Sequence, residues 1–475
     1  MPLSKDKYDV IIIGSGPAAC SSAIRCAQLD LKVLCVDNIP SKLSKKKLSG
    51  IICTTGCLET LILLESAKLY SSLVNDINSH GIYVDNISLD FSQTVKRKNI
   101  IVEQLNQNIV NDFRQNKIEF INAKAKLLDE KIVQIESINF TSNKLVSADN
   151  IILATESSNI SLPCATIDNE YIFDSSTAIN ITEVPNRLAI LGAGVVGLEL
   201  GGIWNRFGSE IILLDAQESF LSVTDNQISR EAYKILTEQG LELRLGARVI
   251  STKIQNKRVL VEYQDAEGNH AIRVDKLIVA SGRKPNSEGL AAPEANLMLD
   301  ENSFVHVNEN YRTNLPNVYA IGDLTMLGPM LPHKAMAEGV FVAEQIAGIH
   351  TSPINYNNIP NVIFTEPQIA WVGQTEQALK SKGLPIKVGV SALSINPQSK
   401  SSSNITGIVK VIACAKTDVI LGVHIISPQA SEMISEAVLA MEFSASSEDI
   451  SKTIHSHPSY SEAIRKACHI IKNID

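Results

Sequence analysis

Several runs of consecutive apolar residues have the length of strands that are buried on both faces. The first spans residues 8–13, and a helical pattern of apolar and polar positions follows it as far as Leu29. A second run at residues 32–36 comes directly after that helix. Continuous apolar strands separated by helical patterns are typical of parallel sheets. The N-terminal part of the chain is therefore predicted to alternate between strand and helix.

The same alternation returns between residues 187 and 215. Further buried strands are predicted at residues 150–155, 277–280 and 317–321, and residues 81–134 are predicted to form a helix followed by short strands. The strand pattern thus continues through most of the chain, as a large parallel α/β structure requires.

From about residue 351 the pattern changes. Strands at residues 408–413 and 419–426, with an amphipathic helix at residues 432–443, predict an antiparallel α+β domain. No low-complexity linker separates this part from the rest, so tight packing is expected.

A glycine motif follows the first predicted strand. Gly14, Gly16 and Ala19 form the pattern G-x-G-x-x-A, and Asp37 ends the next strand, 23 residues after Gly14 (37 − 14). Small residues allow a tight turn and let the helix N-terminus approach a pyrophosphate, while the acid binds a ribose hydroxyl. The strand, the motif, the helix and the acid together predict a dinucleotide-binding unit.

A second glycine motif has the same construction. Gly192, Gly194 and Gly197 follow the strand at residues 187–191, and Asp215 lies 23 residues after Gly192 (215 − 192). The Asp215 carboxylate would repel a 2′-phosphate, and the next two residues supply no cation to receive one. The second unit is therefore predicted to prefer NAD to NADP.

These patterns predict an α/β fold with two Rossmann-like dinucleotide-binding domains and a C-terminal α+β domain. The predicted boundaries are residues 1–151 with 281–350 for the first domain, 152–280 for the second and 351–475 for the third. A length of 475 residues suits three domains of roughly 150 residues each.

Composition narrows the function classes. Hydrophobic residues make up 44% of the chain and charged residues 20%, as in ordinary globular proteins. The net charge of −8 does not support nucleic-acid or anionic-membrane binding. The N-terminus leads straight into the first strand, so no signal peptide is expected. The eight cysteines are scattered, which favours a reducing cytoplasm, and no metal site is predicted.

Two thiols lie close together before an apolar helical run at residues 58–69. Cys53 and Cys57 have the spacing C-x3-C. A nearby pair of cysteines in a chain with a cofactor site can carry two electrons as a dithiol and a disulfide. The alternative is that both are small buried hydrophobic residues, as cysteines often are.

A polar stretch near the C-terminus contains His455, His457 and Glu462. Histidine titrates near neutrality and can relay a proton when a carboxylate orients its other ring nitrogen. Glu462 is a candidate for that orienting group. The alternative is a surface-loop histidine without a chemical role.

Taken together, these features resemble the pyridine nucleotide-disulfide oxidoreductases along essentially the whole chain, and most closely the branch that oxidises dihydrolipoamide. Besides the glycine motifs, the markers are residues 282–286 (Gly-Arg-Lys-Pro-Asn), 320–323, 330–335, and His457-Pro458 with Glu462. The resemblance implies FAD in the first unit, NAD in the second, and a C-terminal domain that forms a homodimer. It also implies a lipoyl domain of a 2-oxo acid dehydrogenase complex as partner.

The resemblance implies roles for individual residues as well. Cys53 and Cys57 would form the redox-active disulfide. His457 and Glu462 would reach the partner subunit's redox site. The cofactor contacts that it implies are at Gly14, Gly16, Ala19, Asp37, Thr155, Gly192, Gly194, Gly197, Glu199, Asp215, Gly282, Asp323, Met330, Leu331 and His333.

The cysteine stretch departs from the family pattern G-G-T-C-x4-C-x-P-[ST]-K. Aligned without gaps from Gly50, the chain has Ile52 at the first cysteine of the pattern, so that Cys53 is one position late, while Cys57 keeps its place. On a regular helix, residues four apart have Cβ atoms roughly 5–6 Å apart, whereas a disulfide needs about 3.5–4.5 Å. A Cys53–Cys57 bridge would require local distortion, which Gly56 permits.

Other departures concern the flavin site. The chain has Glu59 at the proline of the pattern and Leu61 at its lysine, which in the family lies beside the flavin and pairs with a glutamate that matches Glu199. Glu156 stands where the family has glycine close to FAD. A carboxylate there would repel the pyrophosphate unless the side chain turns outward.

Three functions fit these observations. The first is an NAD-dependent enzyme that oxidises dihydrolipoamide through a Cys53–Cys57 disulfide, His457 and FAD. The second is a flavoprotein in which Cys57 alone remains competent, so that NADH is oxidised by dyes, quinones or oxygen without lipoamide turnover. The third is a non-catalytic structural homologue.

Overall fold

The computed structural model describes residues 3–38, 56–136, 143–402 and 406–472. Two compact units account for the chain. The first combines Met1–Glu59, Lys96–Ile160 and Gly282–Tyr356, and the second combines Thr60–Val95, Ser161–Ser281 and Asn357–Asp475. Each unit is described by itself.

The first unit is built on a seven-stranded sheet with the order β3-β2-β1-β6-β5-β4, in which β17 also pairs with β6. The pairings β3-β2, β2-β1, β1-β6 and β6-β17 are parallel, and β4 and β5 add an antiparallel hairpin. The strands are β1 (Leu3–Ile13), β2 (Val33–Asp37), β3 (Glu119–Asn122), β4 (Lys124–Leu127), β5 (Ile132–Glu136), β6 (Lys144–Leu153) and β17 (Val318–Ala320).

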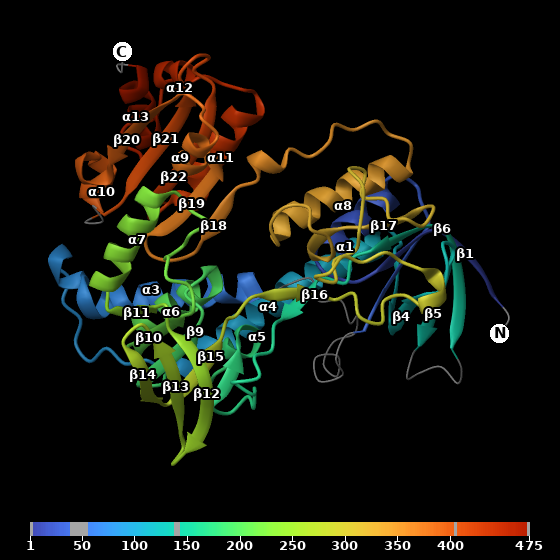
Figure 1. Ribbon diagram of the computed structural model, residues 1–475, viewed down its shortest axis with the longest axis horizontal. Coiled ribbons are helices and arrows are strands. Elements are labelled where there is room, and N and C mark those ends of the chain that lie inside the picture. Colours follow the sequence, from blue (N-terminus) through green and yellow to red (C-terminus); the bar gives the residue numbers. More distant parts are fainter. Residues whose placement is uncertain (1–2, 39–55, 137–142, 403–405, 473–475) are drawn as a thin grey trace. The chain divides into compact units, whose positions relative to one another are not determined.

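Alternate residues of β1 enter different hydrophobic clusters, as the two faces of a strand require. Val10 and Ile12 pack against α1 (Pro17–Gln28) and α8 (Pro332–Ile346), which lie side by side in Figure 1. Ile11 and Ile13 pack with residues of β4, β5 and β17. The predicted apolar strand is thus buried on both faces.

The second unit contains a parallel five-stranded sheet with the order β11-β10-β9-β15-β8. A three-stranded antiparallel sheet, β12-β13-β14, follows it in the chain. The strands are β8 (Ile172–Asp174), β9 (Arg187–Leu191), β10 (Glu210–Asp215), β11 (Leu241–Leu245), β12 (Arg248–Gln255), β13 (Arg258–Asp265), β14 (Gly268–Val274) and β15 (Lys276–Val279). The helices are α3 (Gly56–Asn75), α4 (Phe91–Gln115, shared with the first unit), α5 (Ser175–Ala178), α6 (Val195–Arg206) and α7 (Asn226–Glu238).

The C-terminal part of the second unit is an antiparallel sheet with the order β18-β19-β22-β21-β20, so the predicted α+β domain is confirmed. Its strands are β18 (Asn361–Ile363), β19 (Gln368–Gly373), β20 (Ile386–Ala392), β21 (Ile408–Cys414) and β22 (Ile420–Ser427). Its helices are α9 (Glu376–Ser381), α10 (Pro397–Ser401), α11 (Ala430–Glu442), α12 (Ser447–Lys452) and α13 (Glu462–Lys472). None of the helices in the described ranges has the length and hydropathy needed to cross a bilayer.

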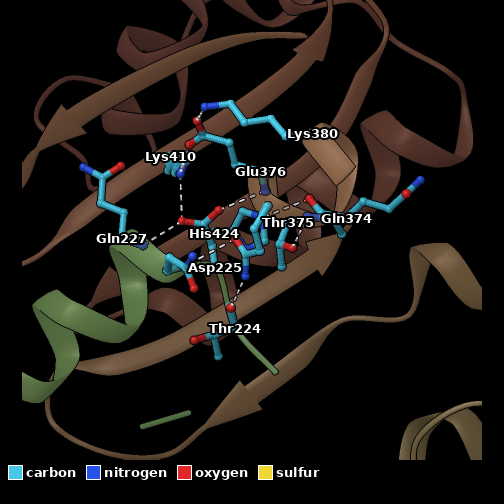
Figure 2. Close-up of polar contacts among 12 residues, drawn as sticks. Thr224, Asp225, Gln227, Gln374, Thr375, Glu376, Lys380, Lys410 and His424 are labelled. Atoms are coloured by element: carbon cyan, nitrogen blue, oxygen red, sulfur yellow. Dashed lines mark hydrogen bonds and ion pairs between the residues drawn. The ribbon is translucent and has the colours of Figure 1, made fainter. Parts of the chain in front are cut away.

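A buried ion network ties α7 to this C-terminal sheet (Figure 2). The Lys410 Nζ atom on β21 lies 2.7 Å from Asp225 Oδ1 and 2.5 Å from Glu376 Oε2. Asp225 also caps α7 by accepting a hydrogen bond from the Gln227 backbone N–H. Burial alone would raise the pKa of Asp225, but the hydrogen bonds from Lys410 and the backbone outweigh it and hold the pKa below its usual range.

Candidate functional site

The first glycine motif forms a tight turn between β1 and α1. Gly14 has a φ of 131°, and a methyl group there would lie 2.0 Å from the carbonyl oxygen of Ala154. Gly16 is the N-cap of α1, where no side chain accepts a hydrogen bond from the first turn, and Ala19 is buried. Among the described residues, no N-cap side chain competes for the backbone N–H groups of this helix N-terminus, which can therefore bind an anion.

Asp37 stands at the end of β2, beside this turn. Its Oδ2 atom accepts a hydrogen bond of 2.5 Å from Ser15 Oγ, and its Oδ1 atom accepts one of 2.8 Å from the Asn38 backbone N–H. The carboxylate is thus held at the strand end, the position from which it can bind a ribose hydroxyl.

The Glu156 side chain points inward. A methyl group on Gly16 would lie 1.6 Å from Glu156 Oε1, so this oxygen lies directly against the glycine. Oε1 is enclosed and has no hydrogen-bond partner among the described residues. Burial raises the pKa of Glu156 to about 7, with further upward contributions from Asp37 and Asp323 and a downward one from Arg283.

Hydrogen bonds from side chains and from the backbone hold the segment that carries Glu156. Thr155 Oγ1 donates to the Asn286 carbonyl over 2.7 Å, and Asn286 Nδ2 donates to the Thr155 carbonyl over 2.9 Å. The Asn286 N–H donates to the Glu156 carbonyl over 3.0 Å. Glu156 itself has a φ of 62°, a left-handed conformation that glycine adopts more easily than glutamate.

Asp323 lies in a short 3-10 helix, η3 (Gly322–Leu324), and accepts a hydrogen bond from Ser157 Oγ. The Arg283 guanidinium donates to Ser157 Oγ over 2.7 Å and to the Ser157 carbonyl over 2.5 Å. The buried Glu338 carboxylate accepts the Gly322 N–H over 2.7 Å, which fixes the turn before Asp323.

Three residues that the resemblance implies as cofactor contacts, Met330, Leu331 and His333, lie where α8 begins. Leu331 is the N-cap of α8, and Met330 comes just before it. Both are half-buried, whereas His333, in the first turn, is exposed. Helix α8 packs beside α1, so these residues belong to the same unit as the first glycine motif.

The second glycine motif has the same geometry. Gly192 has a φ of 106°, and a methyl group there would lie 2.4 Å from the Ala280 carbonyl oxygen. A methyl group on Gly197 would lie 1.9 Å from the Gly192 carbonyl oxygen, so both positions require glycine. A methyl group on Gly194, the N-cap of α6, would have no atom of another residue within 4 Å apart from its chain neighbours.

Asp215 ends β10 in the same way as Asp37 ends β2. Its Oδ2 atom accepts the Ala193 N–H over 2.7 Å, and its Oδ1 atom accepts the Gln217 N–H over 2.8 Å. The carboxylate is therefore anchored to the turn that opens α6, as selection for an unphosphorylated ribose requires.

Glu199 is a buried carboxyl group on α6. Its Oε1 atom accepts the Phe364 N–H over 2.9 Å. Burial raises the pKa of Glu199 to about 7, and the hydrogen bond from Phe364 opposes that rise. Leu61, at the family lysine position, packs against a hydrophobic cluster that includes Leu198 and Leu200. Leu61 is thus an apolar residue at the position of the family lysine, and among the described residues the hydrogen bond to Glu199 comes from the Phe364 backbone.

The cysteine pair is only partly within the described residues. Cys53 lies outside them, and Cys57 is in the first turn of α3, where only its backbone is described. The described cysteine side chains form no disulfide bond. Burial raises the pKa of Cys26 and of Cys468 to about 12 each, so neither is a reactive thiolate near neutral pH.

His457 and Glu462 form the expected pair. His457 Nδ1 lies 2.8 Å from Glu462 Oε1, and the imidazole is mostly exposed. Glu462 Oε2 accepts the Ser459 N–H over 3.0 Å. The hydrogen bond from His457 holds the pKa of Glu462 below its usual range, so the carboxylate stays ionised and fixes the Nδ1–H tautomer. The Nε2 lone pair is left to accept a proton. The neighbouring His455 binds Glu436 instead, over 2.7 Å.

Lys98 and Ser157 were missed at the sequence level. Lys98 on α4 is fully buried and lies 3.9 Å from a carboxylate oxygen of Glu59, the residue at the family proline position. Burial lowers the pKa of Lys98, and Glu59 opposes that shift. Its position between Val95 and Val102, on the apolar face of α4, was the available signal. Ser157 offered no comparable signal, because its partners Arg283 and Asp323 are distant in the chain.

Each glycine motif, with its helix N-terminus and the acid at the end of the next strand, forms a cradle that could hold a dinucleotide. The two cradles differ in how well they fit one. In the second, the turn, the open helix N-terminus and Asp215 fit NAD. In the first, the turn, Asp37 and Asp323 fit the ribose and ribityl ends of FAD, but Glu156 Oε1 fills the space beside Gly16 that a pyrophosphate needs. FAD therefore does not fit the first cradle while Glu156 points inward.

Comparison with known proteins finds the same succession of a nucleotide-binding part and a C-terminal domain along the chain. The family model for pyridine nucleotide-disulphide oxidoreductases matches residues 8–339, and that for their dimerisation domain matches residues 359–468. Dihydrolipoyl dehydrogenase of Cupriavidus necator is 39% identical over 97% of both chains. The mitochondrial dihydrolipoyl dehydrogenase of Schizosaccharomyces pombe is 36% identical over 97% of this chain and 89% of its own.

Solved structures agree on the fold. LpdA of Mycobacterium tuberculosis superposes with a TM-score of 0.87 at 22% identity, over 97% of this chain and 99% of its own. The flavoprotein disulfide reductase RclA of Escherichia coli does so with a TM-score of 0.84 at 24% identity, over 98% of this chain and 100% of its own. The predicted fold class is confirmed, and the chain belongs to the pyridine nucleotide-disulphide oxidoreductase family.

Proposed function

We propose that the protein is an NAD-dependent dihydrolipoyl dehydrogenase, which oxidises protein-bound dihydrolipoamide to lipoamide. The family uses FAD and NAD(H). The observation that carries the proposal is the His457–Glu462 pair, because an oriented imidazole with an available Nε2 is the base that dithiol oxidation needs. Relatives that are 34–39% identical over 97% of this chain bear the same activity in their names.

Each of the protein's own residues has a distinct role in the proposed reaction. His457 takes a proton from a dihydrolipoamide thiol, and the resulting thiolate attacks Cys53, which forms a mixed disulfide and releases Cys57 as a thiolate. The second lipoyl sulfur then displaces Cys53, which takes up the proton of that thiol, so lipoamide leaves as a disulfide and the two cysteines are left reduced. Glu462 stabilises the imidazolium that forms.

Asp215 selects NAD by binding its free 2′-hydroxyl. Asp37 and Asp323 would hold FAD once the Glu156 side chain leaves Gly16, and the flavin would then supply two-electron transfer between the cysteine dithiol and NAD.

The assembly is part of the same proposal. The match to the dimerisation domain at residues 359–468 supports a homodimer. The lipoyl domain of a 2-oxo acid dehydrogenase complex is proposed as the substrate carrier, since the named relatives are dihydrolipoyl dehydrogenases. A cytoplasmic location, which the scattered cysteines favour, completes the proposal.

The decisive experiment is lipoamide-dependent NAD turnover by the purified protein and its Cys53→Ser variant. We expect turnover in the wild type and a loss of at least about 100-fold in the variant, because Cys53 would be the exchange thiol. Cys164→Ser, at a half-buried cysteine outside the site, is the matched control and should behave as wild type. Unchanged turnover in Cys53→Ser would rule out the dithiol mechanism. Dye reduction by NADH without any lipoamide turnover would favour the flavoprotein without lipoamide activity.

A further inference from the structure

The two dinucleotide-binding units differ at one position of the phosphate cradle. Strand β15 is followed by residues 280–282 (Ala-Ser-Gly) and strand β6 by residues 154–156 (Ala-Thr-Glu). Gly282 and Glu156 take corresponding places in these segments, and both have a positive φ, of 104° and 62°. Glutamate therefore stands in the first unit where the second has glycine.

This difference fills one cradle and leaves the other open. A methyl group on Gly16 would lie 1.6 Å from Glu156 Oε1, whereas one on Gly194 would meet nothing within 4 Å. Both glycines are N-caps of helices whose first turns have no side-chain cap. The Glu156 carboxyl group thus lies beside the α1 N-terminus, where the N–H groups and the helix dipole attract an anion.

The charges around Glu156 oppose its ionisation. It is enclosed between α1, Asp37 on β2 and Asp323 in η3, with Arg283 on β16 (Arg283–Pro285) as the facing cation. Arg283 is already engaged by Ser157, through hydrogen bonds to the hydroxyl and carbonyl oxygens. The pKa of Glu156, raised by burial to about 7, places the change of charge within the physiological range.

We propose that the Glu156 carboxyl group is a built-in competitor for the FAD pyrophosphate, so that FAD enters the cradle only when this side chain leaves Gly16, and that FAD binding is coupled to proton uptake by Glu156. The inference rests on the proposed function in assigning FAD to this cradle. A pyrophosphate adds negative charge beside Asp37 and Asp323, so the FAD complex raises the pKa of Glu156 above its value in the free protein. FAD affinity therefore falls as the pH rises through that value, by at most about tenfold per pH unit for one proton.

The test is to titrate the full-length apoprotein with FAD at about pH 6 and at about pH 8. The quenching of flavin fluorescence measures the affinity at each pH. We expect the wild type to bind FAD up to about tenfold more weakly at the higher pH, because the protonated fraction of a group with a pKa of about 7 falls about tenfold between these two values. Glu156→Gln retains the shape but cannot titrate, so its affinity should be the same at both pH values. Glu156→Gly opens the cradle, suits the positive φ, and should bind FAD at least about tenfold more tightly than wild type at pH 8. Glu130→Gln, an exposed glutamate of the same unit, is the matched control and should behave as wild type.

Thermal melting of each apoprotein checks that the variants are folded. The proposal is overturned if Glu156→Gln keeps the pH dependence of wild type, or if folded Glu156→Gly binds FAD no more tightly than wild type. Neither readout needs catalysis. If Glu156→Gly gains FAD as expected but no lipoamide is turned over, the proposed function fails and the role of Glu156 stands.

Discussion

At the scale of single residues, Glu199 makes stability depend on pH. Its carboxyl group is buried on α6 with one hydrogen-bond donor, the Phe364 N–H, and its pKa is raised from 4.5 to about 7. The folded state therefore binds more protons than the unfolded state between these two values. Its favourable contribution is fully present below pH 4.5 and is lost as the pH rises through about 7.

We predict that Glu199→Gln flattens this dependence. One pKa unit corresponds to about 1.4 kcal/mol, so Glu199 accounts for a fall of about 3 kcal/mol in the free energy of unfolding of the wild-type apoprotein between pH 4.5 and 7. The amide side chain of the variant cannot titrate and still accepts the Phe364 N–H. Urea unfolding at several pH values measures the slope, and Glu442→Gln, on exposed surface, serves as the control. An unchanged slope in Glu199→Gln would contradict the assignment.

At the scale of elements, the Asp225–Lys410 pair joins α7 to the C-terminal sheet. We predict that Asp225→Ala lowers the free energy of unfolding by about 3–5 kcal/mol, because it leaves the buried Lys410 charge without one partner and removes the α7 cap. Lys380 offers a matched control, since it pairs with the same Glu376 but is exposed. Lys380→Met should cost about 0–1 kcal/mol in urea unfolding. Equal costs for the two substitutions would mean that burial does not decide the strength of this network.

The elements also show what could be predicted from sequence. Both glycine motifs were predictable because turn, helix start and acid lie within 23 residues, and a positive φ at Gly14 and Gly192 is a local requirement. His457 and Glu462 are five residues apart in the sequence, and their side chains are hydrogen-bonded as expected. The direction of the Glu156 side chain was not predictable, since it depends on α1, 140 positions earlier at Gly16 (156 − 16).

The same physical limit hid the buried ion network. Asp225 and Lys410 are separated by 185 positions, and each alone has the appearance of a surface charge in the sequence. Lys410 does interrupt the apolar run at residues 408–413, but the sequence does not show which distant carboxylate it will meet, because packing alone brings the two charges together.

At the scale of the whole molecule, the proposal makes each redox site a shared property of two chains. His457 and Glu462 fall within the match to the dimerisation domain, residues 359–468, whereas Cys57 opens α3 near the other end of the chain. In a symmetric dimer, a base from one subunit can serve the cysteines of the other. The intact dimer, and not the single chain, would then be the smallest active species.

Mixed dimers test this arrangement directly. His457→Ala and Cys57→Ser chains each lack one half of the chemistry, so both homodimers should be inactive with lipoamide. If His457 serves the cysteines of the partner subunit, a mixed dimer rebuilds one complete site, and random exchange of equal amounts should restore about a quarter of wild-type turnover. If His457 serves its own chain, neither site of the mixed dimer is complete and no activity returns. Tagging the two chains differently and isolating the mixed species measures the restored turnover without homodimer background, and dimers of two differently tagged His457→Ala chains provide the inactive reference.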